Sequence, residues 1–312
     1  MERHINLIFI IIFHIIYGCK SSSDGDVYMF SYFKNNGEDG LHLAYSIDGL
    51  KWEALKNDES FLVPELSNDK LMRDPCIIKG PDGKFHMVWT ISWTEKGIGY
   101  ANSLDLINWS EQKFIPVMEH EKLTKNSWAP ELFYDKKNEQ YLIFWASTVS
   151  DKYTETENQS EGNWNHRMYF TTTKDFINFS ETKIFLEPGF NVIDATITNY
   201  GSSYFMIIKD ETYLPEAKKT LHILLSDSLY DWDVPISDAI SWSWVEGPTI
   251  TKINDDWVIY FDQYKKGSFG AITSSNLLKW EDISEEIKLP NGIRHGTIFK
   301  VSKSVISKIK EL

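Results

Sequence analysis

The feature that most constrains the fold is a short motif that occurs five times along the chain. Each copy is a polar stretch that begins with Ser or Thr and closes on an aromatic side chain. The aromatic residues that close the five copies are Trp52, Trp109, Phe179, Trp232 and Trp280. They follow one another at intervals of 48 to 70 residues. A repeat of this length predicts a fold assembled from five similar units.

The segments between the copies of the motif have the composition of β-strands. Runs of β-branched and aromatic residues follow turn-forming residues such as Gly, Asn and Asp. These runs are 27–33, 84–89, 140–145, 203–208 and 256–261. No segment has the periodicity of an amphipathic helix of three turns. A repeat of about 50 residues with three or four strands is the size of a propeller blade.

We therefore predict an all-β protein that folds as a five-bladed β-propeller in a single domain, residues 27–312. The first copy of the motif has no inner strand ahead of it, whereas the strand at 294–299 stands alone near the C-terminus. The simplest closure places the N- and C-terminal strands in one blade, because this closes the ring and hides its edges. A β-sandwich is the competing architecture, but a sandwich does not require so regular a repeat.

The first 18 residues have the composition of a secretory signal peptide. A basic start precedes an apolar run, residues 7–17, that is too short to span a bilayer. A small residue followed by Cys19 resembles the cleavage site of bacterial lipoproteins, where the cysteine is lipidated. We predict a signal peptide at 1–18, a tether at 19–26, and a lipid on Cys19 as the only membrane attachment. This places the protein in the cell envelope, periplasm or surface of a bacterium; plain secretion is the alternative.

The composition excludes several other classes of protein. The 312-residue chain is 42% hydrophobic and 25% charged, as in ordinary globular proteins. Its net charge of −13 argues against a nucleic acid as a partner, because an acidic surface repels phosphates. The two cysteines are too few for a disulfide framework, so we expect Cys76 to be a small buried side chain. We expect a monomer.

A second pattern recurs at the start of one strand in each predicted blade. Each of these strands begins near an ionisable side chain, and the five are Asp74, Glu131, Asp194, Glu246 and His295. Aligned at one position of the repeat, they are expected at one end of the axial channel. A single Asp or Glu beside Pro or Gly is an ordinary turn residue. Clustered carboxylates, however, push their pKa values apart, which supplies the acid and the base that hydrolyse a glycosidic bond.

The motifs around these residues resemble those of glycoside hydrolase family 43. They are Arg-Asp-Pro at 73–75, Trp-Ala-Pro-Glu at 128–131, Ile-Asp-Ala-Thr at 193–196, Glu-Gly-Pro at 246–248 and Arg-His-Gly at 294–296. Their order and spacing extend over essentially the whole chain after the tether. The resemblance implies that Asp74 is the general base, that Glu246 is the general acid, and that Asp194 orients the acid and adjusts its pKa. It also implies inversion by a single displacement.

The resemblance further implies a carbohydrate substrate, namely a plant-type polysaccharide or oligosaccharide. The expected activity is that of an α-L-arabinofuranosidase or a β-xylosidase, or that of a galactosidase. We expect the sugar to be bound by Arg294, His295, Glu131, Trp128 and Trp244. No cofactor is expected to be required. Some relatives have a histidine that helps to hold calcium at the position of His295, so a structural calcium ion there stays open, although no Asp- and Asn-rich loop accompanies it.

Two further points stay open at this stage. The polar segment 148–166 is long for a hairpin connection, which is consistent with a lip of the binding site or with a solvated insertion. A related group of fructan-cleaving enzymes also carries Arg-Asp-Pro, but their N-terminal Trp-Met-Asn-Asp-Pro element has no counterpart here.

The alternative function is a non-catalytic glycan-binding surface lipoprotein with a propeller fold. The joint presence of Asp74, Asp194 and Glu246 favours the enzyme.

Overall fold

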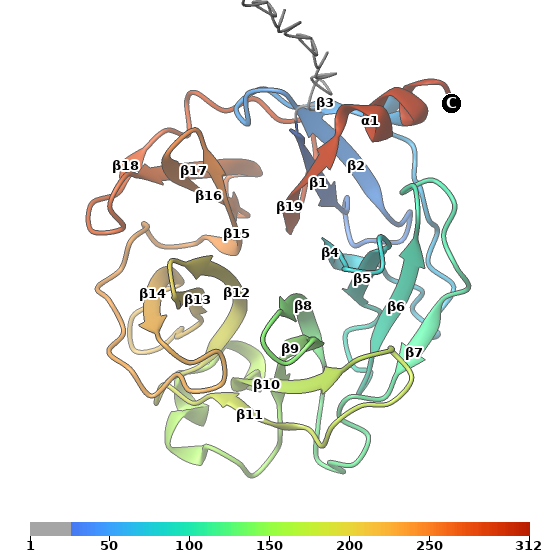
Figure 1. The fold of residues 1–312 in the computed structure, drawn as a ribbon. Coiled ribbons are helices and arrows are strands. Elements are labelled where there is room, and N and C mark those ends of the chain that lie inside the picture. The colour runs from blue at the N-terminus through green and yellow to red at the C-terminus, as the bar shows by residue number, and fades with distance from the viewer. Residues whose placement is uncertain (1–25) are drawn as a thin grey trace, which may run out of the picture.

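The protein is a closed ring of five antiparallel β-sheets, described here from a computed structural model (Figure 1). The structure describes residues 26–312. The predicted signal peptide, the tether up to residue 25 and Cys19 lie outside the described residues. Asp26, assigned to the tether, is the first residue of β1. The five-bladed β-propeller expected from the sequence repeat is confirmed.

Each sheet is one blade, and the blades are numbered by the order of their innermost strands in the chain. Blade 1 contains β4 (Arg73–Lys79), β5 (Phe85–Thr90), β6 (Ile98–Ser103) and β7 (Lys113–Ile115). Blade 2 contains β8 (Trp128–Asp135), β9 (Gln140–Thr148), β10 (His166–Thr173) and β11 (Lys183–Leu186). Blade 3 contains β12 (Val192–Tyr200), β13 (Ser203–Asp210) and β14 (Thr220–Ser226). Blade 4 contains β15 (Glu246–Ile253), β16 (Asp256–Gln263), β17 (Ser268–Ser274) and β18 (Glu281–Asp282).

Blade 5 joins the two ends of the described chain. It contains β19 (Gly296–Ser302), β1 (Asp26–Tyr32), β2 (His42–Ser46) and β3 (Glu53–Ala54). Strands β19 and β1 pair over their full length, so the predicted closure of the ring is confirmed. The innermost strands β4, β8, β12, β15 and β19 contact one another in turn around the axis. The helices are η1 (Lys56–Asp58), η2 (Thr154–Gln159), η3 (Glu161–Asn163) and α1 (Lys303–Lys310).

The repeated motif is the turn after the third strand of each blade. In four copies, one side-chain oxygen accepts hydrogen bonds from the backbone N–H groups two and three residues further on, which closes the turn. These four residues are Asp48, Asp105, Asp175 and Asn276. Ser228 occupies this position in blade 3, which is also the blade with three strands. There an irregular segment covers the outer edge of β14, with Ile236 bridged to Leu224.

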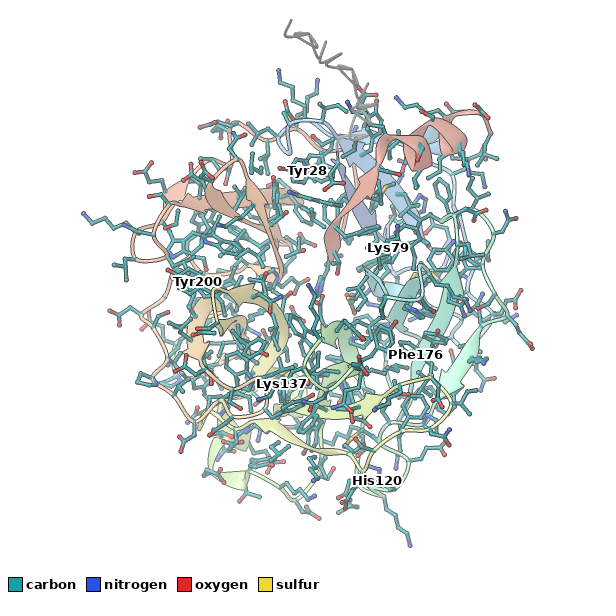
Figure 2. All side chains as sticks on the ribbon, viewed as in Figure 1. Tyr28, Lys79, His120, Lys137, Phe176 and Tyr200 are labelled. Carbon is teal, nitrogen blue, oxygen red and sulfur yellow. The ribbon has the colours of Figure 1, made fainter. Side chains whose placement is uncertain are left out.

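Apolar side chains fill the space between neighbouring blades (Figure 2). The aromatic residues that close the motif contribute to this packing. Trp52 of blade 5 meets Tyr260 of blade 4 edge to face, with 6.1 Å between ring centroids. Trp232 of blade 3 meets Phe185 of blade 2 in the same way at 6.2 Å. Among residues 26–312, no helix is long and apolar enough to cross a membrane.

Candidate active site

A cavity of about 380 Å³ lies where the innermost strands begin. It contains the three predicted catalytic residues, Asp74, Asp194 and Glu246, and three of the predicted sugar-binding residues, Trp128, Arg294 and His295. Seven other residues that line the cavity were not predicted to be site residues: Asn35, Asn36, Arg73, Thr90, Ala129, Ile193 and Glu211. Trp93 completes the lining.

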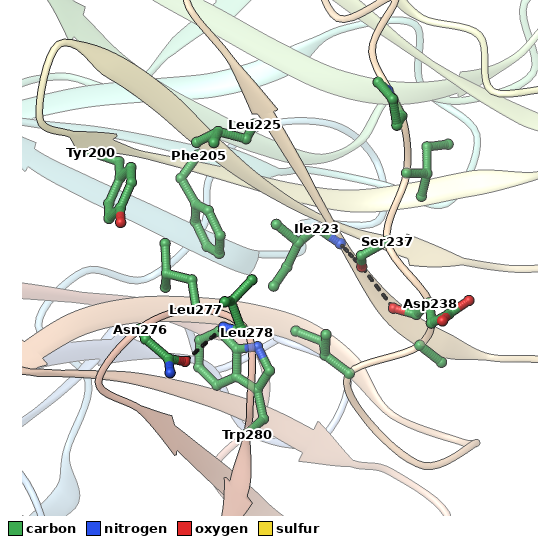
Figure 3. A pocket seen from close by; sticks show the side chains of 14 residues that line it. Tyr200, Phe205, Ile223, Leu225, Ser237, Asp238, Asn276, Leu277, Leu278 and Trp280 are labelled. Carbon is green, nitrogen blue, oxygen red and sulfur yellow. Dashed lines mark hydrogen bonds between the residues drawn. The ribbon is translucent and has the colours of Figure 1, made fainter.

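A larger cavity, of about 750 Å³, lies between blades 3 and 4 (Figure 3). Most of its lining is apolar, including Phe205, Ile223 and Trp280. Asp238 is its only carboxylate among the described residues, and none of the predicted site residues lies there. Acid–base chemistry needs several ionisable groups together, so the smaller cavity on the axis is the candidate active site.

The same backbone irregularity begins four of the innermost strands. The pairing register shifts after the first residue of β4, β8 and β15 and after the second residue of β12, as in a β-bulge. The residue at the shift has a positive φ in each blade: Asp74 (53°), Ala129 (45°), Asp194 (53°) and Gly247 (58°). A Cβ at Gly247 would lie 2.3 Å from Cγ of His295, so only glycine fits at this position. The bulge therefore sets where each side chain at the cavity points.

This register corrects the alignment drawn from the sequence. Asp74 and Asp194 do occupy equivalent positions, but Glu246 lies one residue earlier in its strand. Glu131 lies two residues later than the bulge and is equivalent to Cys76, Thr196 and Thr249. The expectation that all five ionisable groups share one register is wrong. Aligning the prolines at 75, 130 and 248 would have given the correct register.

Asp74 is buried and held in its ionised form. Its Oδ2 accepts a hydrogen bond of 2.8 Å from the hydroxyl of Thr90, and its Oδ1 lies 3.3 Å from Nδ1 of His295. Burial favours the protonated acid, but the hydrogen bond and positive charge of His295 outweigh it and lower the pKa of Asp74 to about 2. The group is thus a permanent proton acceptor at neutral pH.

Asp194 is buried and has the opposite property. Burial is the largest influence and raises its pKa to about 6, while the positive charge of His295 acts in the other direction. The neighbouring charges of Glu246 and Asp74 add to the rise. Its Oδ2 accepts a hydrogen bond of 3.0 Å from the backbone N–H of Gly247, which fixes the carboxyl beside Glu246. Asp194 therefore holds a proton more readily than Asp74.

Glu246 lies between two cations. Its Oε2 is 3.2 Å from Nζ of Lys209, and its Oε1 accepts a hydrogen bond of 2.9 Å from Arg294. Burial alone would raise the pKa of Glu246, but the charge of Lys209, followed by that of Arg294, lowers it below its usual value. Lys209 is fully buried on β13 and also pairs with Glu211 at 2.6 Å. The pKa of Glu246 is thus lowered, whereas that of Asp194 is raised.

Two predicted sugar-binding residues do not line the cavity. Glu131 is buried deeper along the axis, where it accepts hydrogen bonds of 3.2 Å from Thr196 and from Thr297. Burial raises its pKa to about 7. Trp244 packs against the rings of Tyr213 and Tyr264 instead. Both side chains contribute to the architecture around the cavity rather than to its wall.

An aromatic group forms one side of the cavity. Trp128 meets Trp93 edge to face at 5.3 Å and packs at 4.7 Å against Trp164. Trp164 belongs to the long segment between β9 and β10, which thereby reaches the aromatic group even though it does not line the cavity itself. Exposed ring faces of this kind stack on the apolar faces of sugars.

His295 is an ion-pair partner in this arrangement. Burial would lower its pKa, but the charge of Asp194 and the hydrogen bond to Asp74 raise it to about 9. Residues 26–312 contain no group of three or more His, Cys, Asp or Glu side chains arranged to hold a metal. Cys76 is a free thiol and is buried, as predicted.

The solved structures that resemble this fold include several glycosidases. An endo-arabinase from Bacteroides thetaiotaomicron has a TM-score of 0.55 and 14% identity, over 72% of this chain and 84% of that chain. An alpha-L-arabinofuranosidase from Lactobacillus brevis has a TM-score of 0.54 and 15% identity, over 68% and 72%. A thermostable family-43 glycoside hydrolase has a TM-score of 0.53 and 16% identity, over 68% and 71%. At these identities the similarity establishes the fold.

Sequence comparison establishes the family. Among curated proteins, an alpha-L-arabinofuranosidase of Bifidobacterium longum subsp. longum is 24% identical over 160 residues. The match covers 45% of this chain but 15% of that protein. The profile of a family described as "Probable glycosyl hydrolase domain", related to glycoside hydrolase family 43, matches residues 24–306. The resemblance drawn from the motifs is confirmed, and the chain belongs to this family of probable glycosyl hydrolase domains.

Proposed function

We propose that the protein is an inverting glycosidase that acts on plant-type polysaccharides or oligosaccharides. The observation that carries this proposal is the presence of three carboxyl groups in one cavity, where the pKa of Asp194 is raised and those of Asp74 and Glu246 are lowered. Such a divergence is the usual basis for assigning acid and base roles. The arabinose-cleaving relatives favour arabinofuranosyl substrates, with xylosyl and galactosyl units as alternatives.

In the proposed mechanism, Asp74 activates the attacking water. Its low pKa keeps the carboxylate ionised, and the contacts with Thr90 and His295 fix its position. The water loses a proton to Asp74 while its oxygen attacks the anomeric carbon from the face opposite the leaving group. Glu246 donates its proton to the departing glycosidic oxygen, so that one bond forms as the other breaks and the anomeric configuration inverts.

This mechanism requires a proton on Glu246, which the charges of Lys209 and Arg294 disfavour. The largest influence on the pKa of Glu246 is burial, and it already acts upward against Lys209 and Arg294. A sugar that excludes water from the cavity increases this influence. We propose that substrate binding thereby moves the proton to Glu246 and leaves Asp194 as the group that orients it. No cofactor takes part in these steps.

Hydrolysis of aryl glycosides tests this proposal directly. Purified protein should release the aryl group from at least one of an α-L-arabinofuranoside, a β-D-xyloside and a β-D-galactoside. Glu246→Gln should abolish most of the activity on aryl glycosides with poor leaving groups, while Asp238→Asn, in the larger cavity, should leave the activity unchanged. Proton NMR of the first product should show the inverted anomer. Sugar binding without hydrolysis of any of these substrates would instead support the glycan-binding protein.

We also propose that the protein is a monomer held at the bacterial envelope by a lipid on Cys19. The support for the anchor is the resemblance of residues 1–19 to a lipoprotein signal. Cys19→Ser should release the protein from the membrane fraction, and mass spectrometry should then find no acyl chain. A soluble wild-type protein with an unmodified residue 19 would contradict the anchor. Sedimentation of the released protein would test the monomer.

A further inference from the structure

Arg73 differs from the other arginines in the described part of the chain because it has no carboxylate partner. Arg167 pairs with Glu187, and Arg294 pairs with both Glu246 and Asp262. Within residues 26–312, no carboxylate oxygen lies within ion-pair distance of Arg73, although its side chain lines the candidate active site. A half-buried guanidinium that lines a substrate cavity and makes no ion pair is a candidate for binding an anionic group of the substrate.

The position of the Arg73 guanidinium is fixed by three contacts. Its central carbon lies 4.7 Å from the ring centroid of Phe33 and 4.4 Å from that of Trp93. One terminal nitrogen donates a hydrogen bond of 3.0 Å to the side-chain oxygen of Asn36. Aromatic contacts hold the guanidinium without using its N–H donors, so most of the five donors stay available. Such preorganisation reduces the entropic cost of binding a ligand.

The carboxylates of the cavity do not need Arg73 as a partner. Asp74 has His295, and Glu246 has Lys209 and Arg294. The other carboxylate of the wall, Glu211, pairs with Lys209 and with the fully buried Lys219. These three carboxylates are thus paired with other cations, and Arg73 is a cation of the wall that makes no ion pair, although its charge also helps to lower the pKa of Asp74.

We propose that Arg73 binds a carboxylate on the substrate, such as that of a uronic acid unit next to the scissile bond. The planar fork of a guanidinium matches a carboxylate with two parallel hydrogen bonds, which a lysine could not reproduce. Trp93, beside Arg73, presents an aromatic ring for the apolar face of the same sugar. This inference rests on the proposed function, because it takes the ligand of the cavity to be a glycoside.

Calorimetric titration with simple sugars tests the inference without knowledge of the full substrate. The probes are D-galacturonate and D-glucuronate, each with its uncharged methyl ester and its neutral parent sugar. Wild-type protein at low ionic strength should bind at least one of the acids about ten-fold more tightly than its ester. Arg73→Met should remove this ratio, and Arg73→Lys should restore only part of it. Lys279→Met, a charge change at an exposed position outside the cavity, should leave the ratio unchanged.

The outcomes separate this inference from the proposed function. Equal affinities for acid and ester in the wild type, or a ratio retained in Arg73→Met, would overturn the role of Arg73 in binding a carboxylate. Binding of galactose 6-sulfate in place of the uronates would show that the anionic group bound by Arg73 is not a carboxylate. If neutral glycosides are hydrolysed with no preference for an acid, the inference fails while the glycosidase stands. If a uronate binds through Arg73 but no glycoside is cleaved, the inference stands while the glycosidase fails.

Discussion

Asp74 and Asp194 begin equivalent strands of blades 1 and 3 and differ in one chemical property. Both sit at the bulge with a φ of 53°, and both are buried in the same cavity. Nevertheless, the pKa of Asp74 falls to about 2 and that of Asp194 rises to about 6. The backbone therefore places the two carboxyl groups in equivalent positions, and the groups around each carboxyl determine whether it holds a proton.

The groups around Asp74 and Asp194 differ in how well they stabilise a negative charge. Asp74 receives a hydroxyl hydrogen bond from Thr90 and lies against the protonated His295, both of which favour ionisation. Asp194 receives one backbone hydrogen bond from Gly247 and has the ionised Glu246 as a neighbour, which disfavours a second negative charge. The symmetry of the propeller thus supplies equivalent positions, while side chains from neighbouring blades give these positions different roles.

The largest effect that would sharpen this comparison is the loss of the proposed base. Asp74→Asn should reduce kcat by about 10³-fold, because the amide cannot accept a proton from water. The rate is measured on the best aryl glycoside of the panel. With Asp74→Ala, added azide or formate should restore part of the rate by occupying the space of the missing carboxylate. Activity within ten-fold of the wild type in Asp74→Asn would remove this residue from its role.

The loss of the proposed acid should have an effect that depends on the leaving group. Glu246→Gln should reduce kcat by about 10²-fold on substrates with poor leaving groups, since these need a proton on the departing oxygen. On a dinitrophenyl glycoside the reduction should be much smaller. A reduction that is the same for all leaving groups would show that Glu246 does not donate the proton, and Asp194→Asn would then be the next variant to examine.

The sequence was sufficient to predict the ring, its closure and six of the fourteen residues that line the cavity. The repeated turn motif recurs because each copy satisfies the same backbone N–H groups after the third strand of a blade, for example through Asp105. A local pattern with a local cause can be recognised without a structure. The three-stranded blade 3 was not predicted, although its copy of the motif carries Ser228 in place of Asp or Asn.

What the sequence could not supply were contacts between residues far apart in the chain. Lys209 is 37 positions from Glu246, and nothing in its own strand marks it as a buried ion-pair partner. In the sequence Glu131 looks equivalent to Asp74. The bulge shows that it is equivalent to Cys76 instead, so Glu131 lies below the cavity. Trp244 lies two residues before Glu246 in the sequence, but its ring packs against Tyr213 and Tyr264.

Removal of His295 should make Asp74 more like Asp194. In His295→Gln, burial acts on Asp74 without the opposing charge, so the pKa of Asp74 should rise by about 1 to 3 units from about 2. The acidic limb of the profile of kcat/KM against pH should move upward accordingly. The control is Thr90→Val, which removes a neutral hydrogen bond and should move this limb less. An acidic limb that stays in place would show that His295 does not hold Asp74 ionised.

The same ion pair makes stability depend on pH in two directions. The pKa of His295 is raised to about 9, so its contribution is complete below about pH 6.5 and is lost as the pH rises through 9. The pKa of Asp74 is lowered to about 2, so its contribution is present above about pH 4 and is lost as the pH falls through 2. Urea unfolding should therefore show that His295→Gln destabilises the protein most between about pH 4 and 6.5. A constant difference from pH 3 to 9 would contradict this pair.

The smallest expected effect comes from Asp105, a carboxylate outside the cavity, which also serves as a control for the role of Asp74. Asp105 also has a pKa of about 2, because hydrogen bonds from the backbone and side chain of Asn108 and the backbone of Ile107 outweigh the partial burial that would raise it. Asp105→Ala should lower the Tm by about 2 °C through the loss of these hydrogen bonds and leave kcat unchanged. A variant that lost activity without losing stability would show that the outer turn influences the cavity. An unchanged kcat is the expected result. It would show that a low pKa alone does not make a carboxylate catalytic, because Asp105 shares this property with Asp74 but lies outside the cavity.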